Sequence, residues 1–491
     1  MIHFAEPDYA RLPQAFYSRL DPTPVRSPAW IMCNQALAAE LGIDPESLAS
    51  EAGLAIMAGN RVPPGAHPLA MAYAGHQFGN RVPLLGDGRA LLLGEVVGSD
   101  GHLRDLQLKG SGTTPYSRGG DGRSSIGPVV REYLGSEAMS ALGIPSTRAL
   151  AAVATGETVR REKAEPGGIL CRVARSHVRI GTFEYIAAKQ DKALLEALVN
   201  HVMTRHYPEL REHEHPVSGL LEHIIARTAR LVSAWMQVGF VHGVMNTDNC
   251  SIVGETIDFG PFGYIEAFDP ATVYSFIDRR GRYAWNQQPG IAQWNLARLA
   301  EALLPLLADS EAEALDMANA RIAAFGPAFE SHFHAGLANK LGLAERRDGD
   351  AELAFELLRI MHPNRADMTL TFRRLGALSA RDGASNEAVG ELFDDAGAFD
   401  AWAQRWRQRL QAEGQDDASR QSAMNAINPA FILRNHLAQQ AVDAAIEKLD
   451  FDPMHRLNQV LARPFDDQPE HADLARPARP EEQVTTTFCG T

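Results

Sequence analysis

Two side chains with oxygen ligands, Asn249 and Asp258, flank a strand-like run in the segment HGVMNTDNCSIVGETIDFGPFGY, residues 242–264. Carboxylate and amide oxygens are the ligands that Mg²⁺ or Mn²⁺ takes when it bridges nucleotide phosphates. An isolated Asn and Asp are as often turn or cap residues. Asp258, however, opens an intact Asp-Phe-Gly, whose Asp binds metal in phosphate-transferring enzymes. The motif therefore favours a metal site.

The residue that usually accepts the proton of the acceptor hydroxyl is missing from this segment. In the protein-kinase pattern H-R-D-x-x-x-x-N that Asp lies five residues before the Asn, and the position is Val244 here. Because valine cannot accept a proton, either the chain is inert as a transferase or another group acts. Asp248 is the nearest carboxylate and a candidate catalytic base. A turn or helix cap without a chemical role fits its position equally well.

A lysine and a glutamate earlier in the chain have the order and spacing of a phosphate-binding pair. Lys109 ends the strand-like run LQLKG, and Glu132 follows 23 residues later on a predicted helix. In phosphoryl-transfer enzymes a strand Lys reaches the phosphates while it pairs with a helical Glu. An isolated Lys and Glu would indicate an ordinary surface ion pair. Their order before Asn249 and Asp258 favours the phosphate-binding interpretation.

Glycine and arginine residues near this pair could also contact phosphate. Gly86, Gly88 and Arg89 in GDGRA could bring backbone N–H groups close to an anion, although a lone Gly-x-Gly is more often a plain turn. Arg172 and Arg179 in CRVARSHVRI could clamp a polyphosphate with their planar guanidinium groups. A solvated charged face is the alternative for these arginines and for the polar loop SRGGDGRSS. The chain has no Walker A motif.

The patterns around these residues predict an α+β fold of the protein-kinase-like two-lobed type. Apolar runs on either side of Gly-Ser-Asp-Gly predict a hairpin within residues 86–111, and apolar residues at helical spacing predict a helix over 126–142. We expect an N-terminal wrap (1–65), a small strand-rich lobe (66–185), a helical lobe with the metal site (186–463) and a Pro-rich, acidic C-terminal tail with little fixed structure (464–491).

Composition limits the partners and the compartment. The chain has 491 residues, with 47 Lys plus Arg against 61 Asp plus Glu and a formal net charge of -14. This balance gives no electrostatic reason to expect a nucleic-acid or anionic-membrane partner. No leader-like start and no apolar run of about 18 residues is present, so we expect a cytoplasmic protein. Its four cysteines are too scattered for a disulfide framework or a CxxC metal site.

Long stretches of the sequence resemble the selenoprotein O family, pseudokinases by fold that act as protein adenylyltransferases. The matching stretches include AGHQFGNRVPLLGDGRALLLGE, LQLKGSGTTPYSRGGDGRSSIGPVVREYLGSEAMSALGIPSTRAL, VHGVMNTDN and DFGPFGYIEAFDP. The resemblance covers most of residues 1–300 and includes Cys489, where many relatives carry selenocysteine.

The resemblance implies an activity and a role for each candidate residue. ATP would bind in a pose flipped relative to kinases, so that AMP is transferred to Ser, Thr or Tyr of a protein substrate and pyrophosphate is released. Asp248 would accept the proton, and Asn249 and Asp258 would hold Mg²⁺ or Mn²⁺. The nucleotide would be bound by Gly86, Gly88, Arg89, Lys109 (paired with Glu132), Asp121, Gly122, Arg172, Arg179 and Asp258.

One departure from the family concerns redox control. Some bacterial relatives have a loop cysteine after Asp-Phe-Gly that can form a disulfide with the C-terminal one, but the corresponding stretch DPATVYSF has Tyr274. Intramolecular gating of that kind is not expected here. Cys489 could still form mixed disulfides with other proteins, or be an unused thiol.

Two rival functions remain open from the sequence. An ordinary kinase of protein or small-molecule hydroxyls would share the fold and the metal site, and Val244 argues against it. A non-catalytic pseudokinase scaffold would have no use for a complete set of Lys, Glu, Asn and Asp-Phe-Gly. The released product separates the first rival from an adenylyltransferase, because a kinase releases ADP rather than pyrophosphate.

Overall fold

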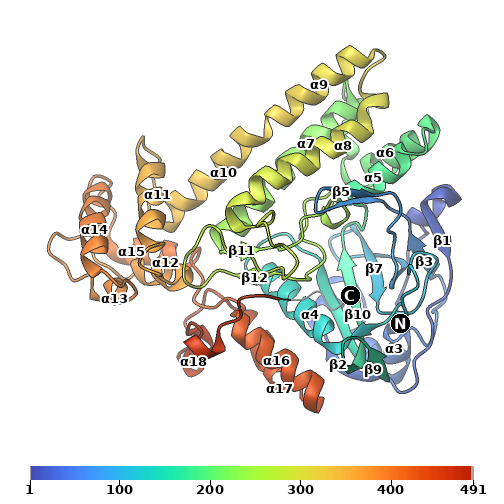
Figure 1. Cartoon of the computed structure of the whole chain (residues 1–491), viewed down its shortest axis with the longest axis horizontal. Coiled ribbons are helices and arrows are strands. Elements are labelled where there is room, and N and C mark those ends of the chain that lie inside the picture. Colours follow the sequence, from blue (N-terminus) through green and yellow to red (C-terminus); the bar gives the residue numbers. More distant parts are fainter. Residues whose placement is uncertain (1, 488–491) are drawn as a thin grey trace.

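The computed structural model describes residues 2–487 and shows an α+β chain with a strand-rich N-terminal part and a helical C-terminal part (Figure 1). The strands are β1 (Tyr17–Arg19), β2 (Ala29–Cys33), β3 (Leu69–Met71), β4 (Gly75–Gln77), β5 (Asn80–Val82), β6 (Ala90–Val97), β7 (Leu103–Lys109), β8 (Ser124–Ser125), β9 (Arg148–Arg160), β10 (Ala164–Ala174), β11 (Phe240–Val241) and β12 (Gly263–Tyr264). The α-helices are α1 (Gln35–Glu40), α2 (Pro45–Ala49), α3 (Glu51–Met57), α4 (Ile126–Ala141), α5 (Ile180–Ala187), α6 (Lys192–His206), α7 (Pro216–Gln237), α8 (Gln288–Leu307), α9 (Glu311–Ala323), α10 (Phe325–Lys340), α11 (Asp350–Met361), α12 (Met368–Leu375), α13 (Glu387–Gly390), α14 (Ala396–Gln411), α15 (Asp417–Asn425), α16 (Asn435–Lys448), α17 (Asp452–Leu461) and α18 (Ala472–Ala475). Short 3-10 turns lie at η1 (Tyr9–Arg11), η2 (Gln14–Phe16), η3 (Pro208–Glu212), η4 (Thr247–Asn249), η5 (Trp285–Gln287), η6 (Pro469–His471) and η7 (Pro480–Glu482).

The main sheet is antiparallel and runs in the order β1-β3-β6-β7-β10-β9-β2, with the short β8 paired to β10. The predicted hairpin is confirmed as β6 and β7. The segment 1–65, expected as a wrap, does more than cover the sheet, because its strands β1 and β2 form the two ends of that order. The sheet therefore has its central strands from residues 69–174 and its edges from the first 33 residues.

Alternation along the strands separates an apolar face from the face that carries the candidate residues. Leu106 and Leu108 on β7 are buried in the cluster beneath α1, α2 and α3, so Gln107 and Lys109 point to the opposite face. On β10, Arg172 is the direct cross-strand partner of Gln107. Lys109 and Arg172 are thereby directed to the same side of the sheet, where α4 packs.

Helix α4 confirms the helix predicted over 126–142. All six residues of its apolar pattern are buried: Val129, Val130, Tyr133, Leu134, Ala138 and Leu142. Ser125 is the N-cap residue, but its side chain makes no capping hydrogen bond. Glu132 lies on the same helix and is 2% exposed, which places a carboxylate directly behind the sheet face that carries Lys109.

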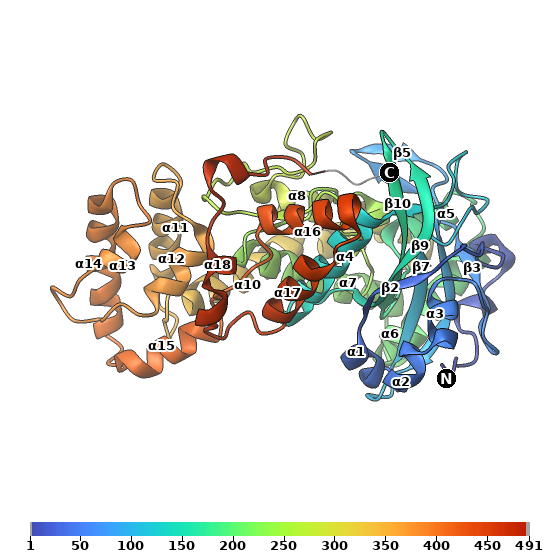
Figure 2. The same cartoon turned by 90° about the horizontal axis from the view of Figure 1, so that it is seen from below.

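The C-terminal part is built on long helices that pack side by side. α7 packs against α8 and α10, and buried pairs such as Leu220–Leu221 and Ile224–Ile225 on α7 recur at the helical period. Figures 1 and 2 show the sheet at one end of the molecule and α13 and α14 at the other, with α7, α8 and α10 between them. Among the helices described here, none has the length and apolar character needed to cross a membrane.

The run between Asn249 and Asp258 is not the strand that its apolar residues suggested. Residues 250–257 form a turn held by isolated bridges of Ser251 to Arg179 and of Thr256 to Ser146. Gly254 has φ of 72°, a left-handed conformation that ends an extended strand. The pair β11–β12 on either side of this run is the local sheet instead.

The stretch from residue 464, expected to have little fixed structure, follows a defined path as far as Thr487. Leu474 on α18 is 6% exposed, and Thr487 is 4% exposed. The Thr487 N–H donates to the Tyr274 carbonyl at 2.7 Å, and the guanidinium of Arg434 donates to the Ala475 carbonyl at 2.9 Å. Residues 474–487 therefore make specific contacts with the rest of the molecule. The prediction for Cys489 lies outside the described residues.

Candidate functional site

A cavity of about 680 Å³ lies where the strand-rich and helical parts meet. Its volume is in the range of small-molecule sites. Of the predicted site residues that the structure describes, all but Glu132 line this cavity: Gly86, Gly88, Arg89, Lys109, Asp121, Gly122, Arg172, Arg179, Asp248, Asn249 and Asp258. Val244 lines it as well. Residues far apart in the sequence are thus brought to one place.

Behind the cavity, Glu132 holds two of the cationic side chains. Its Oε2 accepts a hydrogen bond from Lys109 Nζ at 2.6 Å, and its Oε1 accepts from Arg172 Nε at 2.7 Å. The same two cations reach Asp258 Oδ1, at 3.0 Å from Lys109 Nζ and 2.7 Å from Arg172 Nη2. The predicted pair of Lys109 and Glu132 is present, and it belongs to a four-membered network.

The charges in this network keep both carboxylates ionised. Burial alone would raise the pKa of each, but the positive charges of Arg172 and Lys109 hold the pKa of Glu132 below its usual range. Arg172, Lys109 and Arg179 hold the pKa of Asp258 well below its usual range in the same way. Asp258 is 24% exposed on its side chain, whereas Glu132 is 3% exposed. Asp258 is therefore an ionised carboxylate at the cavity wall.

Arg179 forms the second cationic anchor. Its Nη1 lies 3.5 Å from Asp87 Oδ1 and its Nη2 lies 3.7 Å from Asp258 Oδ2. Its guanidinium carbon stacks 4.3 Å from the centre of the Tyr73 ring, a cation–π contact that fixes the plane of the group. Arg179 is 2% exposed, so this charge is already in place before any ligand arrives.

The cavity is basic in a chain that is acidic as a whole. Eight arginine and lysine side chains line it against four aspartates, whereas the whole chain has a formal net charge of -14. The basic residues are Arg89, Lys109, Arg118, Arg123, Arg160, Arg161, Arg172 and Arg179. A local excess of positive charge favours binding of a polyanion such as a triphosphate in this cavity.

The backbone at Asp258 adopts a left-handed conformation, with φ of 63°. Non-glycine residues adopt it at an energetic cost, and residues strained in this way cluster at functional sites. The Gly260 N–H closes a tight turn by donating to the Asp258 carbonyl at 2.8 Å. This turn directs the Asp258 carboxylate toward Lys109 and Arg172.

Asp248 lies in a different environment from Asp258. It is 7% exposed, and its Oδ1 is buried without a hydrogen-bond partner among the described residues. Its Oδ2 accepts only a long hydrogen bond, from Gln77 Nε2 at 3.4 Å. Burial raises the pKa of Asp248 to about 6. A carboxylate with a pKa close to neutral is well matched to accepting a proton from a hydroxyl.

The donors at the cavity wall fit a hard divalent cation that is shared with a ligand. Asn249 donates its amide N–H to the Val244 carbonyl at 3.1 Å, and Asp258 is ionised. Within residues 2–487 no group of three or more His, Cys, Asp or Glu is arranged to hold a metal on its own. Two protein ligands completed by phosphate oxygens and water is a typical arrangement for Mg²⁺.

The glycines predicted to approach phosphate also have a packing role. A Cβ on Gly86 would lie 2.4 Å from the Tyr116 ring, and one on Gly88 would lie 2.8 Å from the Tyr116 carbonyl. Gly122, with φ of 66°, lies so close to Gly112 that a Cβ would lie 2.1 Å from its carbonyl carbon. These contacts hold the loop 110–123 against the GDGR turn and form one wall of the cavity.

Asp121 is held by a neighbouring arginine. Arg161 donates to its two carboxylate oxygens at 3.0 and 3.2 Å, and the Arg123 N–H donates at 2.9 Å. These interactions lower the pKa of Asp121 against the opposing effect of its partial burial. Asp121 therefore lies at the cavity with its carboxylate already paired.

Asp87, Tyr73, Gln77 and Arg161 are four of the polar cavity residues that sequence reasoning missed. Asp87 lies between Gly86 and Gly88, and its carboxylate accepts hydrogen bonds from Met71 N, Tyr73 Oη and Gln107 Nε2. Its position within the GDGR motif was the only feature of the sequence that linked Asp87 to the site. The other three residues gave no such sign and reach the cavity through the fold: Tyr73, Gln77 and Arg161.

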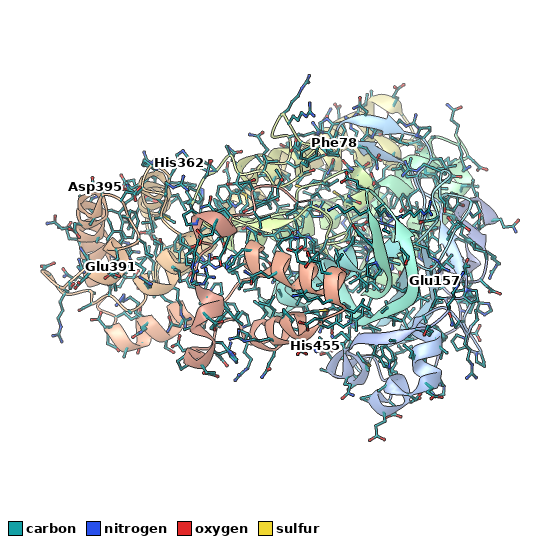
Figure 3. All side chains as sticks on the ribbon, turned by 60° about the horizontal axis from the view of Figure 1, so that its bottom comes forward. Phe78, Glu157, His362, Glu391, Asp395 and His455 are labelled. Carbon is teal, nitrogen blue, oxygen red and sulfur yellow. The ribbon has the colours of Figure 1, made fainter. Side chains whose placement is uncertain are left out.

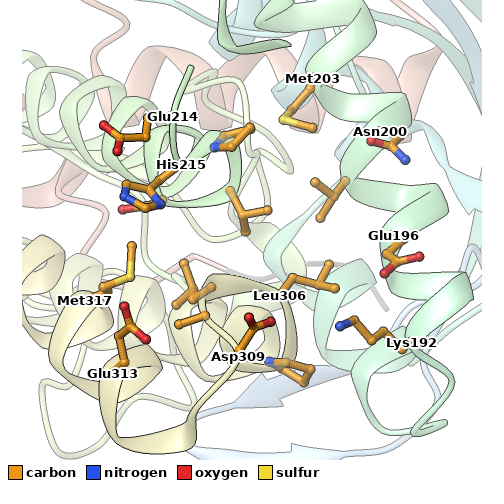
Figure 4. A pocket seen from close by; sticks show the side chains of 17 residues that line it. Lys192, Glu196, Asn200, Met203, Glu214, His215, Leu306, Asp309, Glu313 and Met317 are labelled. Atoms are coloured by element: carbon orange, nitrogen blue, oxygen red, sulfur yellow. The ribbon is translucent and has the colours of Figure 1, made fainter. Parts of the chain in front are cut away.

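A second cavity, of about 500 Å³, contains none of the predicted residues. It lies between α6, the start of α7 and the α8–α9 connection (Figure 4). Glu196 and Asn200 on α6 face Asp309 and Glu313 across an apolar floor that includes Met203. Its acidic lining is unsuited to a nucleotide, so the basic cavity is the candidate site.

Comparison with known proteins gives matches over nearly the whole chain. Residues 2–462 match the family described as "Protein adenylyltransferase SelO". The chain is 58% identical over 483 residues to the "Protein nucleotidyltransferase YdiU" of Alkalilimnicola ehrlichii, with 98% of each chain covered. Proteins of the same description from Methylorubrum extorquens (strain PA1) and Rhodopseudomonas palustris (strain BisB18) are 56% identical over 488 residues, with 98% of each chain covered, and 54% identical over 491 residues, with 100% of each covered.

Proposed function

The chain belongs to the SelO family of protein adenylyltransferases, and from this membership we propose that it transfers AMP from ATP to Ser, Thr or Tyr hydroxyls of proteins. In this reaction the hydroxyl oxygen forms a bond to the α-phosphorus, the bond from that phosphorus to the bridging oxygen breaks, and pyrophosphate leaves. The basic cavity is the observation that carries the proposal, because it joins paired cations to a buried carboxylate of raised pKa.

The cavity residues have distinct roles in this proposal. Lys109, Arg172 and Arg179 bind the phosphates, and Glu132 holds the first two in place. The hydroxyl proton passes to Asp248. Preorganised positive charge around the phosphates stabilises the charge that builds up during transfer. Holding the hydroxyl and the nucleotide together supplies much of the remaining rate.

Asn249 and Asp258 would hold the divalent cation, Mg²⁺ or Mn²⁺, and their hard oxygen donors fit such an ion. When bound, it neutralises phosphate charge and orients the phosphate chain. The ionised state of Asp258 is what cation binding requires, since a protonated carboxyl is a poor ligand.

We further propose that the two parts of the molecule form a protein-kinase-like two-lobed fold. The features that support it are the strand Lys109 paired with Glu132 on a helix, the Asp-Phe-Gly at Asp258, and a cavity between a strand-rich and a helical part. An ordinary kinase is disfavoured because Val244 occupies the position of its catalytic Asp.

Mass spectrometry of an acceptor protein incubated with ATP and Mg²⁺ tests the function. We expect an added AMP, label transfer from α-labelled but not γ-labelled ATP, and loss of both with the Asp258→Ala variant. An added phosphate with release of ADP would instead identify a kinase. Full activity of Asp258→Ala would refute the assignment of the site.

A further inference from the structure

The hairpin formed by β4 and β5 is separate from the main sheet. A two-stranded hairpin of this length is at best marginally stable by itself. Its turn residues Phe78 and Gly79 have φ of 51° and 83°, the positive values that a type I′ turn requires at both positions. Asn, Asp or Gly usually occupies the first of them, so Phe78 is strained. Contacts outside the hairpin must therefore hold this shape.

Those contacts are made with the segment 246–248, which includes the candidate base. The His76 N–H donates to Thr247 Oγ1 at 2.7 Å, and the Phe78 N–H donates to Asn246 Oδ1 at 3.0 Å. Two backbone donors of the strand-rich part are thereby fixed on side chains of the helical part. Figure 3 shows Phe78 at the junction of the two parts.

Between these two anchors the hairpin touches Asp248 itself. Gln77 Nε2 donates to Asp248 Oδ2 at 3.4 Å. A Cβ on Gly75 would lie 2.2 Å from Asp248 Oδ1, so the missing side chain at Gly75 leaves the space that the carboxylate occupies. Gly75 does not have a positive φ, so its backbone conformation does not require glycine. Glycine is required because a larger side chain would collide with Asp248.

The anchors are themselves held by buried groups. Glu184 on α5, with its side chain 6% exposed, binds both the His76 imidazole and the Thr247 hydroxyl. The Tyr283 hydroxyl donates to Asn246 Oδ1 at 2.6 Å. The segment that carries Asp248 is thus fixed from the hairpin, from α5 and from the loop before α8.

We propose that the hairpin of residues 75–82 positions the catalytic carboxylate, with Gln77 and Gly75 as positioning residues that hold Asp248 toward the acceptor hydroxyl. The proposal rests on the proposed function, in which Asp248 accepts the proton. The hydrogen bond that Gln77 donates to Oδ2 limits the rotation of the carboxylate. Gly75 sets how closely the carboxylate approaches the hairpin backbone.

Other charged groups also act on Asp248. Arg179, on the connection between β10 and α5, favours its ionised form, and Asp258 opposes it. A substitution at Gln77 leaves both of these in place. A change in kcat after such a substitution therefore reports the loss of the Gln77 hydrogen bond.

The variant Gln77→Leu tests the proposal through the split between kcat and KM. We expect kcat for AMP transfer to fall about tenfold with little change in KM for ATP, because the position of the carboxylate changes while the cations that hold the phosphates stay in place. Gln293 on α8 is also half-buried, and it donates to the Ile322 carbonyl at 3.2 Å. Gln293→Leu is therefore the matched control and should keep the wild-type kcat and KM.

A second variant, Gly75→Ala, should lower kcat more strongly, by about a hundredfold, because it displaces the carboxylate directly. Crystal structures of the wild type and of Gln77→Leu supply a readout that does not need activity, because the position of the Asp248 carboxylate can be compared directly. An Asp248 carboxylate that keeps its position in Gln77→Leu would overturn the inference. A wild-type protein that transfers no AMP, with a carboxylate that still moves in Gln77→Leu, would instead refute the proposed function and leave the contact established.

Discussion

Asp248 and Asp258 show how burial and neighbouring charge give two aspartate side chains opposite pKa shifts. Asp258 is surrounded by cations and has a lowered pKa, whereas burial raises the pKa of Asp248 to about 6. A base must be ionised to accept a proton, so kcat should rise with pH through about 6 and level off above it. A pH series of initial rates measures this.

The Asp248→Asn variant is the companion measurement. Its kcat should be roughly a hundredfold to ten-thousandfold lower, which is the usual contribution of a general base. Its kcat should also no longer rise with pH near 6. It should still bind ATP, because the cations that hold the phosphates are untouched. A variant with the wild-type rate would show that Asp248 is not the base.

A buried lysine outside the site gives a stability prediction. Lys340 is 3% exposed, its Nζ lies 4.5 Å from the centre of the Phe372 ring, and burial lowers its pKa to about 7. Between pH 7 and 10.5 the unfolded chain binds a proton that the folded chain does not, so stability rises with pH in that window.

Lys340→Met should raise the free energy of unfolding at pH 7 by a few kcal/mol and flatten this rise. Denaturant unfolding at pH 7 and 9 measures both effects. Equal stability gains at the two pH values would contradict the explanation.

At the same scale, chain order predicted which residues gather at the site, but not all of their partners. Lys109, Glu132, Asn249 and Asp258 could be related because their order and spacing follow a known pattern. The contact between Gln77 and Asp248 joins residues 171 positions apart. Nothing local to either residue encodes that contact, since it depends on how the hairpin docks on the helical part.

Helix α4 connects the sheet to the Asp-Phe-Gly turn, and Gly135 is where the two meet. A Cβ there would lie 2.6 Å from Phe262 and 2.9 Å from Phe259. Ala for Gly inside a helix normally stabilises by about 1 kcal/mol, but here the overpacking should outweigh that gain. Gly135→Ala should lower the free energy of unfolding by about 1 kcal/mol or more. It should also slow AMP transfer, because Phe259 follows Asp258 directly.

The matched control for this helix substitution is Gly290→Ala in α8. Apart from its chain neighbours and the backbone of its own helix turn, no atom lies within 4 Å of a Cβ at Gly290, so the same change should be neutral or slightly stabilising. Thermal unfolding and AMP transfer of the two variants, measured side by side, separate helix propensity from contact. Equal effects at the two positions would show that the contact with Phe262 does not matter.

Most of the elements could be predicted because their patterns are regular. β6, β7 and α4 follow periods of two and 3.6 residues over enough positions to be unambiguous. The run 250–257 is too short for that, and its buried Ile252 and Val253 satisfy a turn as well as a strand. The positive φ of Gly254 is what makes this run a turn. The sequence does not show that φ, because it depends on the surrounding fold.

For the whole molecule, the stretch 464–487 is part of the structure rather than an appendage. Its composition is acidic and Pro-rich, which is typical of disorder, yet Leu474 is buried and Arg434 donates to Ala475. Ending the chain after Arg463 should therefore lower the free energy of unfolding by about 2 kcal/mol or more. Ending it after Thr487 keeps these contacts and should cost far less. Denaturant unfolding of both truncated proteins measures the difference, and equal losses would contradict this account.

The sheet order has a consequence for how the chain is made. Its two edge strands, β1 and β2, come from the first 33 residues, and Ala29 pairs with Ala154. At roughly 5–20 residues per second, a ribosome adds Ala154 about 6 to 25 s after Ala29. Strand β2 is therefore made long before its partner β9 exists, whereas β1 pairs with β3, about 50 residues further along the chain. During translation β2 has to remain unpaired and protected from aggregation until β9 has been synthesised.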